Sequence, residues 1–421
     1  MARFRIPYGR THLTFTLSDA LHTELIAPAP IAPVPDAARA VMDALDAPLD
    51  FAWEKFAHAR PKGVAIAIND KTRPVPLAIL LPPLLARLTH MGIVDDAITL
   101  IIATGAHTPM RPDEFANIVP ADALRVARHR VICHDCDDRA NLVELGTTTR
   151  GTRVWANRVF MQADFRIALG DIEPHQFMGF SGGVKSAAIG LAARETITHN
   201  HAMMLNPRAQ VGKYDDNPAR QDAEEIGKMM GVHFALNAVI DEEKQIVGVF
   251  AGDPVAVMRA GMPLALDLYR VRVSGEFDLM IVSPGGHPKD INLYQAQKAL
   301  AHATPVVRKG GTVILTAACP EGSGSKLHEE YMHGMTAHEQ VLERFKCEPF
   351  RLGYHKAFQI ARDATRVRLL MVSEMSSDLM KRLLLTRCDS LDDALAFALR
   401  DLPCDAHVGV MPVGNVTIPT M

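Results

Sequence analysis

Short apolar runs alternate along the chain with longer stretches that have an apolar residue every three or four positions. The short runs are bounded by Gly, Pro, Asp or Asn, as buried parallel strands are. They predict strands at Val64–Ile68, Ile98–Ala103, Phe165–Leu169, Leu279–Val282 and Thr312–Thr316. Helical patterns lie between them, for instance at Pro76–Met91 and Tyr294–His302. This alternation predicts an α/β fold with largely parallel sheets.

The length of the chain predicts more than one domain. A chain of 421 residues is too long for one ordinary core. A boundary is expected near residues 252–273, where Asp253 can cap a helix that has Pro254 at its first position. We therefore expect two α/β domains, residues 1–260 and 261–421, with the membership of the last ten residues left open. The opening residues, Phe4–Tyr8 and then Thr11–Leu17, predict a β-hairpin.

Composition and charge narrow the class of protein. The chain is 48% hydrophobic and 22% charged, which is ordinary for a globular protein. A net charge of −3 gives no basic footprint for nucleic acid. The N-terminus lacks the apolar core of a secretory signal, and the most apolar run, Val75–Ala86, is too short to span a bilayer of ~30 Å. We expect no membrane partner.

Cysteine usage predicts a reducing compartment, and hence the cytoplasm. The six cysteines are scattered, and only Cys133 and Cys136 lie close together. His134 stands between them, which could indicate zinc, but a second ligand pair at finger spacing is absent. We interpret these three residues as ordinary residues at a strand edge.

Polar residues with chemical potential follow several of the predicted strands. Ligands of open α/β sheets bind outside the carboxyl ends of the strands. These ends are followed by Asn69–Pro74, Thr104–His107, Gly170–His175 and Ser283–Pro288. We therefore expect Arg73, His107, His175 and Lys185 to point toward one cleft, and we expect this active-site cleft to lie between the two domains. Each residue alone is also compatible with a purely structural role.

The stretch GFSGGVKS (179–186) resembles a phosphate-binding loop without matching it. A Walker loop has adjacent Gly and Lys, and here Val184 separates Gly183 from Lys185. Gly182 and Gly183 could still turn backbone N–H groups toward an anion, helped by the positive end of a following helix. No GxGxxG motif follows a strand, which argues against a classical NAD site.

The histidines downstream constrain the local geometry. On one straight helix Lys185 and His201 would lie about 24 Å apart, so the helix must break if both contact one small cofactor, and Gly190 is a candidate position. His199 and His201 face different ways on a helix, so at most one of them is expected to be a ligand. Gln295 and Lys298 share a helix face and could bind a carboxylate together, although an exposed polar face explains them equally well.

Together these residues resemble the nickel-dependent lactate racemase family over nearly the whole chain. The two long matching segments are specific, and the short ones would be weak alone. The matching segments are IPYG (6–9), DKTRP (70–74), ATGAH (103–107), PHQFMGFSGGVKS (174–186), THNH (198–201), DINLYQAQKAL (290–300), CPEGSGS (319–325) and GYHKA (353–357).

The resemblance implies an unusual cofactor. The family uses a nickel-pincer nucleotide, a pyridinium mononucleotide whose thioamide and thiocarboxylate sulfurs hold nickel together with a ring carbon. By this resemblance the cofactor is tethered through Lys185, nickel is completed by His201, and the cofactor-binding domain is residues 1–260. An imidazole suits nickel in a tetragonal site. The remaining cofactor-binding residues implied are Gly182, Gly183, Ser186 and Asp70.

The resemblance also implies the reaction. His107 and His175 would be the catalytic acid and base, and Arg73, Gln295 and Lys298 would bind the substrate. The implied activity is a racemase or epimerase that inverts C2 of a 2-hydroxy acid by hydride transfer to and from the cofactor. Expected partners are the small 2-hydroxy acid and the proteins that make the cofactor.

Two other functions stay open from the residues. A protein that stores or carries the nickel cofactor would need Lys185 and His201 but not His107, His175 and Arg73. A nucleotide-dependent kinase or ligase would need acidic residues for magnesium, and no convincing set stands beside the loop.

Overall fold

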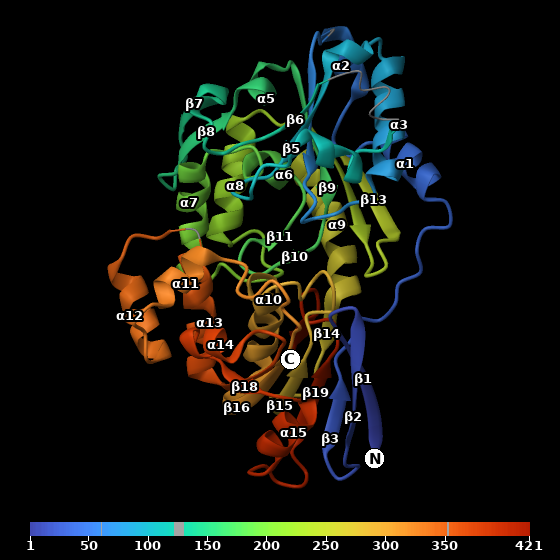
Figure 1. The fold of residues 1–421 in the computed structure, drawn as a ribbon. Coiled ribbons are helices and arrows are strands. Elements are labelled where there is room, and N and C mark those ends of the chain that lie inside the picture. Colours follow the sequence, from blue (N-terminus) through green and yellow to red (C-terminus); the bar gives the residue numbers. More distant parts are fainter. Residues whose placement is uncertain (60, 122–129, 352) are drawn as a thin grey trace. The chain divides into compact units, whose positions relative to one another are not determined.

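The computed structural model describes residues 1–421 except 60, 122–129 and 352, and the chain divides into two compact units (Figure 1). Unit 1 comprises residues 1–29 and 269–421, and unit 2 comprises residues 30–268. This division differs from the expected 1–260 and 261–421. The first 29 residues belong with the C-terminal part because a strand at His22–Leu25 pairs with one at His407–Met411.

Unit 2 is built on a six-stranded sheet. Its strands, in spatial order, are β13 (Ile246–Gly252), β12 (Phe234–Ile240), β9 (Phe165–Asp171), β4 (Val64–Asn69), β5 (Ile98–Ala103) and β6 (Arg130–Cys133). Every neighbouring pair is parallel except β12 with β13. From β4 the chain runs to β5 and β6 on one side and then returns to β9 on the other. The connections therefore diverge at the carboxyl ends of β4 and β9, where open α/β sheets bind ligands.

Helices cover both faces of this sheet. They are α1 (Ala37–Asp46), α2 (Trp53–Ala59), α3 (Leu77–His90), α5 (Arg158–Gln162), α6 (Lys185–Ala188), α7 (Arg194–Ala202), α8 (Pro218–Met229) and α9 (Pro254–Tyr269). Alternate residues of β4 face opposite sides, as the strand period requires. Ile66 and Ile68 pack in one apolar cluster with α3, whereas Ala65 and Ala67 pack in another with the alanines of α6. The small residues let α6 lie close to the sheet.

Two small hairpins complete unit 2. One consists of β7 (Leu142–Thr147) and β8 (Arg153–Asn157), and the other of β10 (Pro174–His175) and β11 (Gly179–Phe180). The second hairpin carries one of the candidate histidines directly after β9.

Unit 1 has its own six-stranded sheet, and all its neighbouring pairs are parallel. The order is β18 (Thr386–Cys388), β17 (Arg368–Val372), β16 (Val307–Thr316), β15 (Phe277–Val282), β19 (His407–Met411) and β3 (His22–Leu25). A hairpin of β1 (Ala2–Tyr8) and β2 (Thr11–Leu17) precedes it. The last residues belong here, because β20 (Ile418–Thr420) pairs with β14 (Arg270–Arg272).

The helices of unit 1 lie on the two faces of its sheet, with one apolar cluster under each face. They are α10 (Leu293–Ala303), α11 (Lys326–Met332), α12 (His338–Cys347), α13 (Tyr354–Arg366), α14 (Ser377–Arg382) and α15 (Leu391–Leu399). Clusters on both faces are what a parallel sheet needs, since its strands are buried on both sides.

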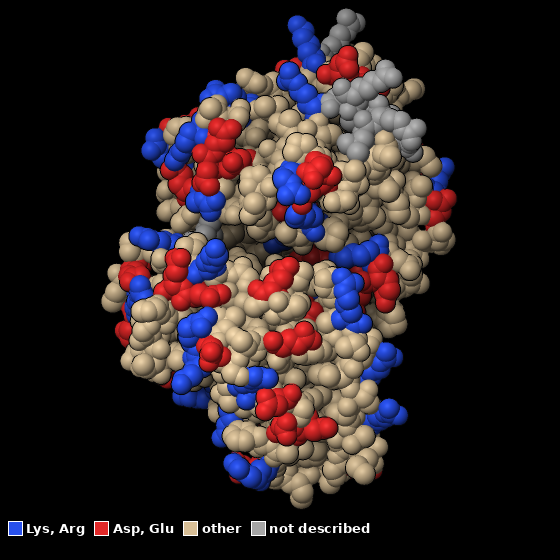
Figure 2. Space-filling view, viewed as in Figure 1, with Lys and Arg blue, Asp and Glu red and all other residues tan. Residues whose placement is uncertain are grey.

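The α/β class and the five predicted strands are confirmed, as are the N-terminal hairpin and both named helices. Asp253 caps α9 as expected, because the amides of Val255 and Ala256 donate to its Oδ1 at 2.9 and 3.0 Å. Among the described residues, no helix has the length and apolar character needed to cross a membrane. Basic and acidic side chains are interspersed on the face shown in Figure 2.

Candidate functional site

Three strand ends of unit 2 bring candidate residues to one edge of its sheet. Asn69 at the end of β4 lies opposite Ala103 at the end of β5, and Asp171 ends the neighbouring β9. The loops that leave these ends carry Arg73, His107 and His175. The fourth strand that we expected to contribute, β15, lies in unit 1.

His107 is paired with the buried carboxylate of Asp70. Its Nδ1 lies 2.7 Å from Asp70 Oδ2, while Thr72 donates to Asp70 Oδ1 from its amide (3.0 Å) and its hydroxyl (2.7 Å). Burial acts to raise the pKa of Asp70, but the hydrogen bond and charge of His107 and the bonds from Thr72 outweigh it, so the pKa is lowered. An ionised carboxylate only accepts hydrogen bonds, so Nδ1 of His107 carries a proton and Nε2 presents a lone pair. Asp70, expected at the cofactor, therefore orients His107 in this structure.

His107 is exposed enough to react with a substrate, whereas its partner Asp70 is buried and fixed in place. The side chain of Asp70 is 4% exposed, whereas that of His107 is 43% exposed. An aspartate behind a histidine holds the ring in one tautomer and stabilises its protonated form, as in serine hydrolases.

His175 sits on the β10–β11 hairpin. Its Nδ1 accepts a hydrogen bond from the amide of Met178 at 3.3 Å, and it lies opposite Gly179 in the hairpin. Gly179 has φ +75°, and a Cβ there would lie 1.7 Å from the carbonyl oxygen of Lys213. Only glycine fits, so the tight turn that presents His175 depends on it.

The ring of Phe177 links His175 to His201. It makes edge-to-face contacts with both imidazoles, at centroid distances of 4.8 and 4.9 Å. Phe177 is buried, and Asn217 Nδ2 donates to its carbonyl at 2.8 Å. Sequence reasoning missed this residue, although it stands inside the longest matching segment.

The backbone of the glycine loop is fixed by hydrogen bonds to buried side chains. Arg220, which is fully buried, donates to the carbonyls of Phe180 (3.1 Å) and Gly182 (3.2 Å), and the amide of Gly183 donates to Asn237 Oδ1 at 2.7 Å. The Gly183 amide is thus engaged by protein, contrary to the expectation that it turns toward an anion. The helix that follows, α6, has only four residues, so the expected helix end contributes little dipole.

The predicted break between Lys185 and His201 is confirmed. Lys185 begins α6, which ends at Ala188, and His201 lies near the end of α7, which begins at Arg194. Gly190 lies in the break, and its carbonyl accepts from the amide of Gly105 at 2.9 Å. A Cβ at Gly190 would lie 2.6 Å from Ala103 Cβ, so the turn packs closely on the end of β5.

His201 is the electrostatic centre of the candidate residues. Burial lowers its pKa to about 3, and the charges of Lys185, Arg73 and His107 act in the same direction. A low pKa keeps the imidazole neutral near pH 7, which is the form that binds a metal. His199 points elsewhere, with its Nδ1 2.7 Å from Thr152 Oγ1, as the helix geometry predicted.

Asp171 is a second buried acid at the carboxyl ends of these strands, and it was not predicted. Asp171 accepts a hydrogen bond from Asn69 Nδ2 at 2.8 Å, and Asn69 Oδ1 accepts from Ser186 Oγ at 3.1 Å. Burial, helped by the charge of Glu173, raises the pKa of Asp171 to about 7, with Arg73 among the groups that lower it. Ser186, expected at the cofactor, therefore ties α6 to β4 here. The signal for Asp171 was its place at the strand end, just before the His175 hairpin.

Helix α8 and its N-cap residue Asn217 contribute buried polar side chains that form hydrogen bonds with three parts of this region. Asn217 holds the Phe177 carbonyl, Arg220 holds the glycine loop, and Asp222 accepts a hydrogen bond from Asn200, the residue before His201. All three are fully buried.

The predicted substrate-binding residues of unit 1 lie together on α10. Lys298 Nζ donates to Gln295 Oε1 at 2.7 Å, so the shared helix face is confirmed. Asn292 caps the helix, accepting from the amide of Gln295 at 3.1 Å. A Cβ at Gly324 would lie 2.4 Å from Asn292 Cγ, which accounts for a glycine in the CPEGSGS segment.

Asp290 connects other matching segments of unit 1. Its Oδ2 accepts from the amides of Gly9 (2.6 Å) and Ala318 (3.2 Å). The carbonyl of Asp290 also accepts from the amide of Cys319 at 2.9 Å, so the IPYG and CPEGSGS segments meet at Asp290, which precedes α10.

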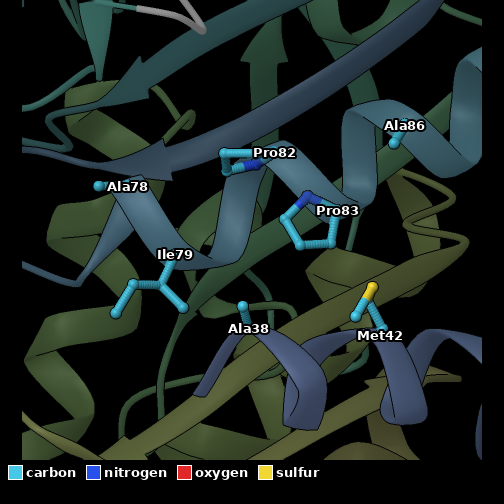
Figure 3. Close-up of a pocket in the computed structure, with 7 residues that line it drawn as sticks. All are labelled: Ala38, Met42, Ala78, Ile79, Pro82, Pro83 and Ala86. Atoms are coloured by element: carbon cyan, nitrogen blue, oxygen red, sulfur yellow. The ribbon is translucent and has the colours of Figure 1, made fainter. Parts of the chain in front are cut away.

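Two further features have no part in this site. His134 is buried and bonds to the Ala192 carbonyl (3.0 Å) and to Asn157 Nδ2 (3.2 Å), so it is structural. A groove of about 520 Å³ lies between α1 and α3, and Figure 3 shows the residues that line it. Its lining is apolar and offers no group for acid–base or metal chemistry: Ala38, Met42, Ala78, Ile79, Pro82, Pro83 and Ala86.

Comparison with known proteins identifies the family of the chain. Residues 8–212 match the lactate racemase N-terminal domain, and residues 273–418 match the lactate racemase C-terminal domain. The lactate racemase of Lactiplantibacillus plantarum is 31% identical, over 83% of each chain. That of Thermoanaerobacterium thermosaccharolyticum is 29% identical, over 98% of each chain.

Two solved structures resemble the fold of this chain. The lactate racemase apoprotein of Thermoanaerobacterium thermosaccharolyticum superimposes with a TM-score of 0.90 at 27% identity, and the match covers all of both chains. A protein from Thermotoga maritima shares the fold, with a TM-score of 0.66 at 18% identity, over 91% of this chain and 97% of its own.

Proposed function

The chain belongs to the lactate racemase family, and we propose that it inverts C2 of a 2-hydroxy carboxylic acid with the help of a nickel-pincer nucleotide. The protein is an isomerase of the racemase type. The observation that carries the proposal is that His107, Lys185 and Arg73 are all close enough to His201 for their charges to lower the pKa of its imidazole.

The residues fit the implied cofactor in its metal and amine requirements. His201 supplies a neutral imidazole, a ligand that suits nickel. Lys185 supplies an amine for the tether, and its side chain is not fully buried. The glycine loop fits less well, because the Gly183 amide already donates to Asn237. We therefore assign the cofactor to His201 and Lys185 and leave its phosphate unassigned.

When bound, the cofactor supplies an acceptor and donor for the hydrogen at C2. The remaining steps belong to the chain's own residues. Arg73 binds the substrate carboxylate, since guanidinium and carboxylate match in geometry. Nε2 of His107 takes the proton of the 2-hydroxyl, while Asp70 holds the ring and stabilises the charge that forms.

Inversion requires the hydrogen to return to C2 on the opposite face of the planar keto acid, and His175 is assigned as the acid–base group for the hydroxyl of the second enantiomer. The ring of Phe177 contacts the imidazoles of both His175 and His201, so it links the assigned acid–base group to the proposed metal ligand. The substrate-binding roles of Gln295 and Lys298 stay predictions. A protein that only stored the cofactor would have no use for the Asp70–His107 pair.

The fate of the C2 hydrogen tests this function. Cofactor-loaded protein is first screened with enantiopure 2-hydroxy acids to find a substrate. Racemisation of that substrate in D₂O should then put little deuterium at C2, and C2-deuterated substrate should keep its label and react more slowly. Solvent deuterium entering at the rate of inversion would refute hydride transfer, because a proton removed as such exchanges with water.

A matched pair of variants tests the metal assignment. His201→Ala should lose nickel and activity together, whereas His199→Ala should keep both, since His199 is directed to Thr152. Equal loss of nickel from the two variants would contradict the assignment.

A further inference from the structure

The imidazole of His201 contacts a chain of hydrogen bonds that continues into the buried residues of α7 and α8. Its Nδ1 lies 3.1 Å from Oδ1 of Asn200, the preceding residue of α7. Asn200 and Asp222 are both completely buried, and they are joined by a hydrogen bond of 2.9 Å. Burying a polar group without a hydrogen-bond partner costs free energy, so these hydrogen bonds stabilise the two buried side chains in this orientation.

The orientation of the Asn200 amide follows from its other partners. Nδ2 donates to the carbonyl of Ala219 at 2.8 Å and to Asp222 Oδ2 at 2.9 Å. Both partners are acceptors, so the amide nitrogen must face them and the oxygen must face His201. An amide oxygen only accepts, so Nδ1 of His201 carries the proton.

Asp222 is fixed in turn by two threonines. Its Oδ1 accepts from Thr148 Oγ1 at 2.7 Å, and its Oδ2 accepts from Thr152 Oγ1 at 2.9 Å. Because the Thr152 hydroxyl donates to Asp222, it accepts from Nδ1 of His199. These bonds keep the Asp222 carboxylate within hydrogen-bond distance of Asn200. The carboxylate polarises the Asn200 amide, which makes its oxygen a stronger acceptor for His201.

We propose that Asn200 and Asp222 are positioning residues that fix His201 as its Nδ1–H tautomer, with the lone pair of Nε2 directed to nickel. This inference rests on the proposed function, in which His201 is the nickel ligand. Partners behind a metal-binding histidine fix its tautomer and ring orientation, and their loss typically weakens metal binding by about 10- to 100-fold.

The tautomer is tested without metal or activity. Metal-free protein labelled with ¹⁵N-histidine is measured by long-range ¹H–¹⁵N NMR, and the His201→Gln variant identifies the signals of His201. The expected pattern is a protonated Nδ1 and an unprotonated Nε2. A protonated Nε2 would overturn the proposal, whether or not the protein proves to use nickel.

Metal retention tests the consequence. Nickel is measured by mass spectrometry during chelator challenge of cofactor-loaded protein. Asn200→Leu, which keeps the approximate size but removes the acceptor, should lose nickel about 10- to 100-fold faster than the parent protein. Asp222→Asn should accelerate the loss less, because an amide oxygen can still accept from Asn200. Glu195→Gln, a change at an exposed position of the same helix, should leave the rate unchanged.

The controls separate folding from positioning. Circular dichroism and thermal unfolding of the metal-free variants show whether each one folds; if Asn200→Leu does not, Asp222→Asn and the tautomer decide the matter. Retention at the parent rate in folded Asn200→Leu and Asp222→Asn would refute the inference while leaving His201 as ligand. A parent protein that binds no nickel when cofactor is supplied would instead refute the proposed function.

Discussion

Replacing Asp171 with asparagine should make the stability of unit 2 less dependent on pH. The carboxyl of Asp171 is buried at the end of β9, and burial with the charge of Glu173 raises its pKa to about 7. Asparagine keeps an oxygen for the Asn69 amide, which donates to Asp171 Oδ1 at 2.8 Å, but it does not titrate. The parent protein and Asp171→Asn therefore differ mainly in whether the side chain at position 171 can lose a proton.

The sign follows from the two states of the chain. In the unfolded chain the carboxyl has a pKa of about 3.9, so the folded pKa is the higher one. The neutral buried acid therefore stabilises the fold fully below the unfolded pKa, and this contribution is lost as the pH rises through 7. Between pH 5 and pH 8 the loss covers about two pH units, or roughly 3 kcal/mol at about 1.4 kcal/mol per unit.

Thermal unfolding of the ligand-free protein measures this difference. For a unit the size of residues 30–268, about 1 kcal/mol shifts Tm by roughly 2–4 °C. The gap between Asp171→Asn and the parent protein should therefore change by roughly 5–10 °C between pH 5 and pH 8, in favour of the variant at pH 8. Asp216→Asn, which removes an exposed carboxylate in the same unit, should show no such change. A gap that is the same at both pH values would refute the raised pKa.

Three further variants test the site. Asp70→Asn should lower the racemisation rate by about 10²–10⁴-fold while nickel content stays normal, because His107 loses the partner that fixes its tautomer; near-normal rates in both directions would remove Asp70 from the mechanism. Gly183→Ala should lower the Tm of the ligand-free protein, because φ is +58° and the new Cβ would lie 2.7 Å from Met258 Cγ; an unchanged Tm would mean that the loop relaxes freely. Lys185→Ala should abolish any excess of intact mass that the cofactor-loaded parent shows over its sequence mass, and a loaded, active parent without such an excess would mean that the cofactor is held non-covalently.

The fold could be predicted because its strands are buried on both faces. Such strands appear in the sequence as short, nearly continuous apolar runs, and five of them were found from that signal alone. β3 gave no such signal. Its four residues are exposed or only partly buried, and the strand is placed in the sheet by its pairing with β19. The membership of the N-terminal residues therefore could not be read from local pattern.

The residue types of the site could be anticipated, but their partners could not. Asp70 and His107 are 37 positions apart and meet because β4 and β5 are neighbours in the sheet. The same holds for Gly183 and Asn237, whose hydrogen bond depends on β12 lying beside β9. A single sequence shows which residues follow strands, and the order of the strands then decides which of them touch.

The pairing of β3 with β19 has a consequence for synthesis of the protein. His22 pairs with His407, so an early strand must wait for almost the whole chain before its partner exists. At translation speeds of roughly 5–20 residues per second, that interval is about 20–80 s. Residues 30–268 are complete long before then and form a compact unit of their own, so unit 2 can fold on the ribosome while β3 still lacks its partner strand. The nascent chain can thus form α7, the helix of the proposed nickel ligand, before the other unit can close its sheet.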